Sequence, residues 1–235
     1  MDNPRERPDA APPSEPPAFA DRTEAGVLLG AAVRAALGGR DLVRFGNTAP
    51  RVVALPRGGV PVAAGVARAL GASLDVLIVR KIGHPAAPEL GLGAIAEGGA
   101  EPLFDPEMLA RAGLAERDLA DVVARERAEL ARRVAVYRRR PPADLTGLLV
   151  VVVDDGLATG VTARAALREA RARGAARSVL AVPVAAAAAI AAVKSETGEV
   201  VTLVTPRRFR SVGEWYADFG QLTDADVLTL LVAIP

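Results

Sequence analysis

One segment limits the possible folds of this chain more than any other: residues 148–162, which read LLVVVVDDGLATGVT. Its first six residues are apolar and four of them are valine, a composition typical of a buried β-strand. Two aspartates and a turn with two glycines follow, and apolar residues then return at helical spacing. A strand that passes through a tight turn into a helix is the repeating unit of α/β folds, so we expect such a fold here.

The same alternation of strand and helix patterns runs through most of the sequence. The expected strands are five apolar segments, 52–55, 74–79, 148–153, 178–184 and 200–204. The expected helices are 19–37, 60–70, 106–140 with a break at Gly113, 162–173, 185–194 and 224–231. This order predicts a single, doubly wound parallel sheet of about five strands, with helices on both faces.

The segments between these elements complete the predicted organisation. Residues 1–17 are rich in proline and are expected to form a disordered tail, which leaves 18–235 as one domain. Asp21 or Thr23 is suited to cap the first helix, and the glycines at 38–39 are suited to end it. Residues 81–100 are rich in Gly, Pro and Ala and are expected to form a long loop that can include a short hairpin.

Ligands of parallel α/β sheets bind at the carboxyl ends of the strands. The loops that leave those ends are 56–59, 81–99, 154–162 and 205–220. We therefore expect these four loops to converge on one site.

The composition excludes several kinds of site. Cysteine is absent, which excludes disulfides, thiolate zinc sites and thiol nucleophiles. A Ser-His-Asp triad would need the single histidine, His84, and one histidine argues against a histidine-based metal site. The net charge of +1 favours neither nucleic acid nor membrane as a partner. No apolar run reaches membrane-spanning length and the N-terminus is not a signal peptide, so we expect a cytoplasmic protein.

The turn at 156–162 has the properties of a phosphate cradle. Glycines allow successive backbone N–H groups to point inward, and the N-terminus of the following helix adds partial positive charge. Thr159 and Thr162 add hydroxyl donors. Asp154 and Asp155, directly before the turn, would repel a phosphate but suit sugar hydroxyls or a Mg²⁺ ion. A phosphate beside a diol describes a ribose 5-phosphate.

Less specific interpretations of this segment exist. A strand followed by two acids is also found at the Walker B strand of nucleotide hydrolases or in an ordinary loop between strand and helix. The pattern GxxxxGK[ST], which forms the phosphate-binding loop of P-loop hydrolases, occurs nowhere in the chain, so that class of enzyme is disfavoured. The glycines at 91 and 93 do not form a dinucleotide-binding fingerprint either, because position 96 is alanine. These absences favour the sugar phosphate.

Residues 150–167, VVVVDDGLATGVTARAAL, closely resemble the signature of type I phosphoribosyltransferases. Residues 55–89, LPRGGVPVAAGVARALGASLDVLIVRKIGHPAAPE, resemble the pyrophosphate loop, helix, strand and lid entrance of the adenine-type members. The resemblance covers residues 19–231. It implies the type I phosphoribosyltransferase fold with a small hood, mainly at 205–220, and a flexible lid loop at 82–99.

The resemblance also implies roles for individual residues. Asp154 and Asp155 would bind the ribose 2- and 3-hydroxyls and, through water or those hydroxyls, Mg²⁺. The 5-phosphate would be bound by Gly156, Leu157, Ala158, Thr159, Gly160 and Thr162. The departing pyrophosphate would be bound by Pro56, Arg57, Gly58, Gly59, Arg80 and Lys81, in a loop that often contains a non-proline cis peptide. Asp154, Asp155, Lys81 and Arg57 would be the catalytic residues.

The acceptor is less clearly marked. Trp215, Tyr216 and Glu97 are the candidate acceptor-binding residues, although Trp215 is equally suited to packing the hood and Glu97 to lying in solvent. Ala158 stands where 6-oxopurine enzymes have an aspartate, which disfavours hypoxanthine and guanine. The basic run at 138–140 is interpreted as a solvated helix end rather than a nucleic-acid site.

These observations favour a Mg²⁺-dependent phosphoribosyltransferase that transfers the ribose 5-phosphate of phosphoribosyl pyrophosphate to a nitrogenous, nucleobase-like acceptor. We also expect a homodimer, for which an apolar stripe on the helix at 115–137 is suited. The alternative is a regulatory protein that binds the donor or a nucleotide without turnover. A phosphohydrolase that uses the paired aspartates is weaker, because no second cluster of metal ligands is visible in the sequence.

Overall fold

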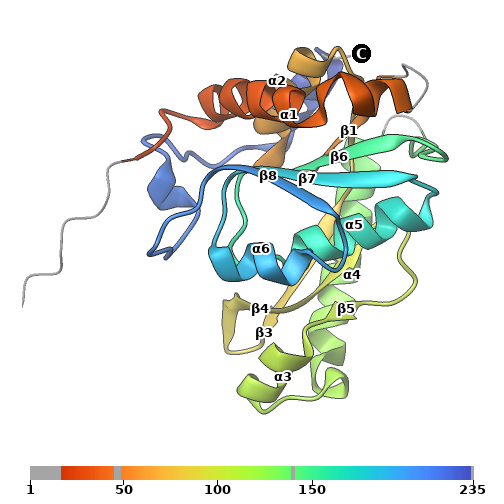
Figure 1. Ribbon diagram of the computed structural model, residues 1–235. Helices are drawn as coiled ribbons and strands as arrows, with labels where there is room; N and C mark the ends of the chain where they lie inside the picture. The colour runs from red at the N-terminus through yellow and green to blue at the C-terminus, as the bar shows by residue number, and fades with distance from the viewer. Residues whose placement is uncertain (1–16, 45–48, 139–140, 234–235) are drawn as a thin grey trace, which may run out of the picture.

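The computed structural model describes residues 17–44, 49–138 and 141–233, so nearly all of the predicted tail lies outside the described residues. Five strands form one parallel sheet in the order β2-β1-β6-β7-β8 (Figure 1). They are β1 (Arg51–Ala54), β2 (Leu74–Val76), β6 (Leu149–Val153), β7 (Arg177–Val184) and β8 (Glu199–Val204). The predicted five-stranded parallel sheet is confirmed.

The central strand, β6, is buried on both of its faces, as its run of valines indicates. Val151 and Val153 belong to the hydrophobic core on one side of the sheet, and Val150 and Val152 to the core on the other. All four side chains are fully buried. A strand in this position has no solvent-facing side, which explains why its sequence is continuously apolar rather than alternating.

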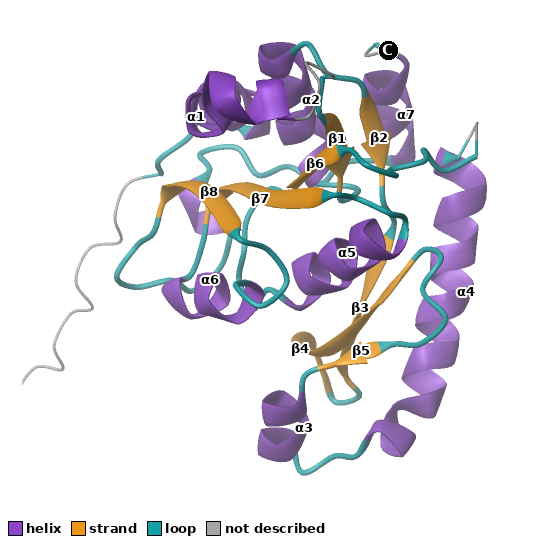
Figure 2. Ribbon diagram, turned by 45° about the vertical axis from the view of Figure 1, so that its right-hand side comes forward, coloured by secondary structure: helices purple, strands orange, loops and turns teal. Residues whose placement is uncertain are grey.

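Helices cover both faces of the sheet (Figure 2). One face packs against α1 (Arg22–Arg44), α2 (Gly59–Leu70) and α7 (Asp224–Val232). The other packs against α5 (Val161–Ala172) and α6 (Ala187–Val193). Asp21 caps α1, because its Oδ1 accepts hydrogen bonds from the N–H groups of Thr23 and Glu24. Helical geometry is interrupted at Gly38 (φ 51°), where the first helix was expected to end, and then resumes to Arg44.

The segment expected to be a long loop that can include a short hairpin forms a hairpin over most of its length, so the hairpin is confirmed and the long loop is corrected. Strand β2 ends at Val76, and a separate strand β3 (Val79–His84) pairs with β4 (Ala87–Ala96), which pairs with β5 (Leu103–Phe104). The sequence did not indicate the extent of these strands, because they are rich in glycine, which has a low strand propensity. Here it allows close approach: a Cβ on Gly93 would lie 2.6 Å from the Leu103 carbonyl oxygen.

This three-stranded sheet and the helices that follow it form a lobe with its own core. The helices are α3 (Pro106–Ala112), the 3-10 helix η1 (Glu116–Leu119) and α4 (Ala120–Tyr137), with the predicted break at Gly113. Ile82, Leu92 and Ile95 of the strands are fully buried against apolar side chains of these helices. We call residues 79–137 the hairpin lobe.

A buried ion pair joins the hairpin lobe to the parallel sheet. Arg138, which follows α4, donates to Glu97 Oε2 at 2.9 Å, to Asp75 Oδ1 at 2.8 Å and to the Val76 carbonyl at 2.6 Å. Arg138 was expected to lie on a solvated helix end, but its side chain is only 9% exposed. Positions 139 and 140 lie outside the described residues.

Crossing a bilayer requires a helix that is both long and apolar. None of the helices in the described part of the chain meets that requirement.

Candidate active site

The predicted phosphate cradle lies between β6 and α5. Gly160 immediately precedes α5 and has φ 83°, a conformation that favours glycine, and a Cβ there would lie 3.0 Å from Val193 Cγ1. The backbone amides of Ala158, Thr159 and Gly160 donate to no acceptor in the described chain, and neither do the hydroxyls of Thr159 and Thr162. The turn therefore offers unused donors at the N-terminus of a helix, as anion binding requires.

Leu157 differs from the rest of the cradle. Its amide already donates to the Val184 carbonyl at 2.9 Å, and its carbonyl accepts from Ala186 at 2.9 Å. Its side chain is 2% exposed and packs into the core beneath α5. Leu157 fixes the turn to β7 and α6, and the neighbouring residues supply the free donors.

The two acids lie directly before the cradle, and one oxygen of each is occupied. Asp154 Oδ1 accepts the Asp155 amide at 2.9 Å, and Asp155 Oδ2 accepts Arg22 Nε at 2.8 Å. The other two oxygens, Asp154 Oδ2 and Asp155 Oδ1, accept no hydrogen bond from a backbone N–H, hydroxyl or cation of the described residues. The two carboxyl groups also contact each other, and these two oxygens are the candidate acceptors for a ligand.

Burial and the neighbouring Asp155 charge raise the pKa of Asp154 well above its usual value. Burial also raises the pKa of Asp155, and the Arg22 guanidinium partly opposes that shift. We infer an ionised Asp155 paired with Arg22 beside a more readily protonated Asp154. Two buried carboxylates side by side favour such a division of charge.

The predicted pyrophosphate loop packs directly on these acids. A Cβ on Gly58 would lie 1.9 Å from Asp155 Oδ2, and a Cβ on Gly59 would lie 2.7 Å from the Val153 carbonyl oxygen. Only glycine allows this approach. The Pro56–Arg57 peptide is cis, as the resemblance implied. The amides of Arg57 and Gly58 donate to no described acceptor.

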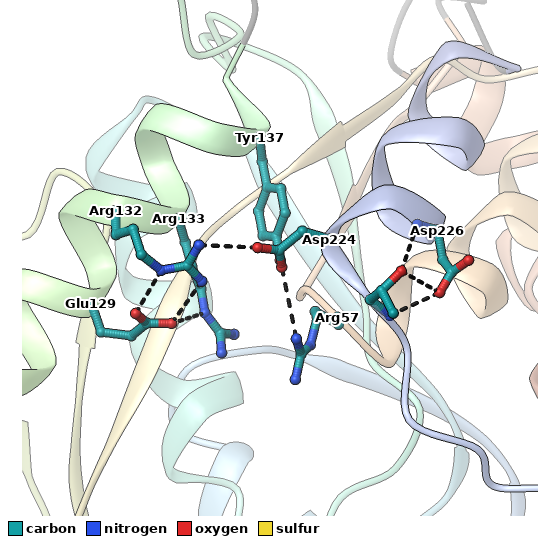
Figure 3. A network of polar contacts seen from close by, with 8 residues as sticks. Arg57, Glu129, Arg132, Arg133, Tyr137, Asp224 and Asp226 are labelled. Carbon is teal, nitrogen blue, oxygen red and sulfur yellow. Dashed lines mark hydrogen bonds and ion pairs between the residues drawn. The ribbon is translucent and has the colours of Figure 1, made fainter.

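The Arg57 side chain reaches away from the loop toward α7 (Figure 3). Its Nη1 lies 3.7 Å from Asp224 Oδ1, and the side chain is 36% exposed. Asp224 is itself held by the Tyr137 hydroxyl and by Arg132, whose Nη1 lies 3.0 Å from Asp224 Oδ2. Burial of the phenol, followed by its hydrogen bond to Asp224, raises the pKa of Tyr137 to about 12. Arg57 is therefore tethered to α4 and α7 through one carboxylate.

Arg80 and Lys81 are adjacent in β3 and point to opposite sides of the strand. Arg80 binds Glu126 of α4, with Nε 2.8 Å and Nη2 2.7 Å from Oε2. Lys81 lies on the cradle side, because a Cβ on Gly91 would contact both Lys81 Cδ, at 3.3 Å, and Val161 Cγ1, at 3.5 Å. Lys81 Nζ binds Glu89 Oε2 at 3.1 Å. Of the two basic residues, Lys81 is the one near the helix N-terminus.

The candidate acceptor residues are all buried. Trp215 and Tyr216 are 6% and 4% exposed and pack with Phe19, and the Tyr216 hydroxyl donates to the Asp155 carbonyl at 2.6 Å. The Trp215 Nε1 is buried with no partner in the described chain. Glu97 is 7% exposed and binds Arg138. The structure thus shows the packing arrangement for Trp215, and an acceptor role for the three residues stays a prediction.

The four predicted loops do meet. Residues 56–59 contact the two acids, and Lys81 and Gly91 of the hairpin lobe lie beside Val161 at the start of α5. From the segment 205–220, Val212 faces the cradle, since a Cβ on Gly156 would lie 2.5 Å from Val212 Cγ1. The carboxyl ends of the strands therefore carry one composite site, as parallel sheets require.

Sequence reasoning gave no role to Arg22, Asp224 or Tyr137. Arg22 lies 133 positions from its partner Asp155, and Tyr137 lies 87 positions from Asp224. Contacts across such separations leave no local spacing pattern. No local pattern in the sequence around these three residues indicates the contacts that they make.

The described residues contain no group of three or more His, Cys, Asp or Glu side chains placed to hold a metal ion. The donor set at the site is the carboxylate pair Asp154 and Asp155. Mg²⁺ is commonly bound by one or two carboxylates, with water and substrate phosphates completing its shell, so this pair fits Mg²⁺ bound together with a substrate.

The parallel sheet carries a phosphate cradle, two acids at the end of a strand and a glycine loop packed on these acids. This is the arrangement expected of a phosphoribosyltransferase. The family model described as "Phosphoribosyl transferase domain" matches residues 24–209. The chain therefore belongs to the phosphoribosyl transferase domain family. The matched range includes the cradle, the acids and the pyrophosphate loop, and leaves out Arg22 and residues 213–220.

Individual relatives agree with this assignment. "Putative phosphoribosyl transferase MT0597" of Mycobacterium tuberculosis (strain CDC 1551 / Oshkosh) is 44% identical over 215 residues, which are 91% of this chain and 46% of the relative. "Putative phosphoribosyl transferase Rv0571c" of the H37Rv strain matches to the same extent. The chain thus spans about half the length of the curated relatives it matches.

A solved structure extends the comparison to three dimensions. The crystal structure of TT1426 from Thermus thermophilus superimposes with a TM-score of 0.71 and 45% identity, covering 92% of this chain and 98% of that one.

Proposed function

We propose that this chain transfers the ribose 5-phosphate of phosphoribosyl pyrophosphate to a nitrogenous, nucleobase-like acceptor, with release of pyrophosphate. The observation that carries the proposal is the pair of free carboxylate oxygens, one on Asp154 and one on Asp155, between two sets of unused backbone donors. Two adjacent hydroxyls need two acceptors, and the phosphate groups on either side of a phosphoribosyl donor need donors. Membership of the family supports the same ligand.

Each part of the site has a task in this reaction. The turn at 156–162 would bind the 5-phosphate, mainly through the free amides of Ala158, Thr159 and Gly160. The pyrophosphate would lie at the amides of Arg57 and Gly58, within reach of the Arg57 and Lys81 side chains. These donors are fixed before the substrate arrives, which is how preorganised charge stabilises a leaving group.

The chemical step joins an acceptor nitrogen to C1 of the ribose while the bond from C1 to the pyrophosphate oxygen breaks. The bonding electron pair leaves with pyrophosphate, and the proton of the acceptor nitrogen passes to the departing pyrophosphate. Positive charge that develops on the sugar lies near the ionised Asp155. Negative charge that develops on pyrophosphate lies near the cationic side chains, of which Lys81 must leave Glu89 to contact it.

Mg²⁺ would supply charge neutralisation for the pyrophosphate, with Asp154 and Asp155 as the nearest carboxylates. The hairpin lobe would supply the lid, since the tip of the hairpin at residues 85–90 is exposed. Water exclusion there protects the donor from hydrolysis. The homodimer expected from the sequence belongs to the same proposal.

The position of Ala158 limits the acceptor. Ala158 is exposed at the cradle and has no group that exchanges a proton with a purine N7. We therefore expect little activity with hypoxanthine or guanine.

The test is pyrophosphate release from phosphoribosyl pyrophosphate, with and without Mg²⁺, across a panel of purine, pyrimidine and pyridine acceptors. Acceptor-dependent release that Asp155→Asn abolishes would support the proposal. Tight donor binding without release for any acceptor would support a regulatory role instead. Failure of the donor to bind would exclude both.

A further inference from the structure

Arg22, the first residue of α1, contacts the sugar end of the site although it lies far away in the sequence. Its Nε donates to Asp155 Oδ2 at 2.8 Å, and its Nη1 donates to the Gly220 carbonyl at 2.9 Å. Its guanidinium carbon lies 3.7 Å from the centre of the Phe219 ring, within cation–π range. The side chains of Arg22 and Asp155 are only 12% and 16% exposed. A buried cation with three such contacts is held in one position.

The surroundings of Arg22 are two chain segments that pair with each other. The Phe19 amide donates to the Trp215 carbonyl at 3.0 Å, and the amides of Ala217 and Asp218 donate back to residues 19 and 20 at 2.8 Å. The rings of Phe19, Tyr216 and Phe219 stack in sequence, with centroids 5.4 and 5.1 Å apart. We call residues 18–22 and 215–220 together the clamp.

The clamp holds Asp155 at two places. Arg22 binds the carboxylate, and the Tyr216 hydroxyl donates to the main-chain carbonyl of the same residue at 2.6 Å. Gly58 of the pyrophosphate loop packs against the same oxygen that Arg22 binds, because a Cβ there would lie 1.9 Å from Asp155 Oδ2. Asp155 is therefore fixed in both conformation and charge, with Oδ1 as the one oxygen left for a ligand.

We propose that Arg22 is a positioning residue of the sugar site, which orients Asp155 so that Oδ1 accepts the 2-hydroxyl of the ribose. The inference rests on the proposed function, because it takes the vicinal diol of a ribose 5-phosphate unit as the ligand. Without Arg22, Asp155 would have no cation within hydrogen-bond range in the described chain, and its carboxylate would no longer be held in one orientation. The phosphate cradle does not touch Arg22, so phosphate binding should not depend on it.

The experiment compares two sugars that differ in one hydroxyl. Dissociation constants of the full chain for ribose 5-phosphate, 2-deoxyribose 5-phosphate and inorganic phosphate are measured by calorimetry. The variants are Arg22→Gln, which removes the charge, and Arg22→Lys, which keeps it but loses the planar fork. Arg34→Gln is the matched control, because Arg34 is exposed on the same helix and contacts no described partner.

We expect the wild type and Arg34→Gln to prefer ribose 5-phosphate over the deoxy sugar. Arg22→Gln should lose about tenfold of that preference, as expected for a charge-assisted hydrogen bond, while its affinity for inorganic phosphate stays unchanged. Arg22→Lys should retain part of the preference. A merely structural role would lower all three affinities together and would not change their ratio.

An Arg22→Gln variant with the full wild-type preference would overturn the inference and leave the proposed function standing. If that variant does not fold, Arg22→Lys decides, and an undiminished preference there overturns the inference too. A wild type without any preference between the two sugars would overturn the assignment of the acids to the diol, and with it the role of Arg22.

Discussion

Replacing Gly58 with alanine would place a methyl carbon where the Asp155 carboxylate lies. The added carbon would be 1.9 Å from Asp155 Oδ2 and 2.5 Å from its Cγ. Real Cβ contacts are essentially never shorter than 3.0 Å, so the carboxylate or the loop must move by about 1 Å. Gly58 has right-handed helical backbone angles, φ −58° and ψ −37°, which alanine adopts freely. The effect of this substitution therefore arises from that contact alone.

The expected loss of ligand affinity follows from the hydrogen bond that the displaced Asp155 carboxylate would lose. Its 2.8 Å hydrogen bond with Arg22 is charge-assisted and is worth about 1.5–3 kcal/mol. A ligand that needs Asp155 in its present position must restore that contact, so we expect the Kd for ribose 5-phosphate to rise roughly 10- to 100-fold. Overpacking should also cost about 1–3 kcal/mol of stability and lower the Tm by roughly 2–10 °C.

Calorimetry with ribose 5-phosphate and thermal unfolding measure the two effects. Gly198→Ala is the matched control, because no heavy atom lies within 4 Å of a Cβ at that position. We expect this control to bind and melt like the wild type. A Gly58→Ala variant that binds the sugar as tightly as the wild type would refute the contact between the loop and the acid.

Three further predictions test other parts of the molecule. Asp224→Asn should release Arg57 and raise the donor KM about two- to fivefold in steady-state kinetics, the effect of a partly exposed ion pair, whereas Asp226→Asn on the same helix should not. Because burial raises the pKa of Asp154, the folded chain releases that proton at a higher pH than the unfolded chain. The free energy of unfolding should therefore fall as the pH rises from about 4 through the raised pKa, and Asp154→Asn should remove that part of the slope in urea titrations. Glu97→Gln should cost about 1–3 kcal/mol in urea unfolding, because it weakens the buried contact with Arg138, and an unchanged free energy of unfolding would contradict this.

The predictable parts of the fold are those that depend on residues adjacent to one another in the sequence. Residues 148–162 carry a strand, two acids and a helix start in one continuous stretch, and the structure places β6 and α5 at these positions. The phosphate cradle follows from the same residues, because a glycine turn before a helix has few alternative geometries. The valines at 150–153 also indicated a buried strand, and the structure covers this strand on both faces.

The parts that were missed depend on long-range contacts. The strands of the hairpin lobe contain Gly83, Gly91 and Gly93, and their pairing is decided by partners elsewhere in the fold. Arg80 and Lys81 are both basic, so the sequence does not distinguish them. In the structure Arg80 binds Glu126 of a later helix and points away from the site. Glu97 is an acid in a glycine-rich stretch, and nothing local shows that Arg138 buries it.

The hairpin lobe has a consequence for the energetics of ligand closure. A lid made of a disordered loop loses about 1–2 kcal/mol of backbone entropy for each residue that becomes ordered on closing. The strands β3 and β4 are already paired, and Ile82, Leu92 and Ile95 are already packed into a core of their own. If this lobe is the lid, it would close over a ligand with its strands already ordered, so closure would lose less backbone entropy and more of the contact energy would remain available as affinity.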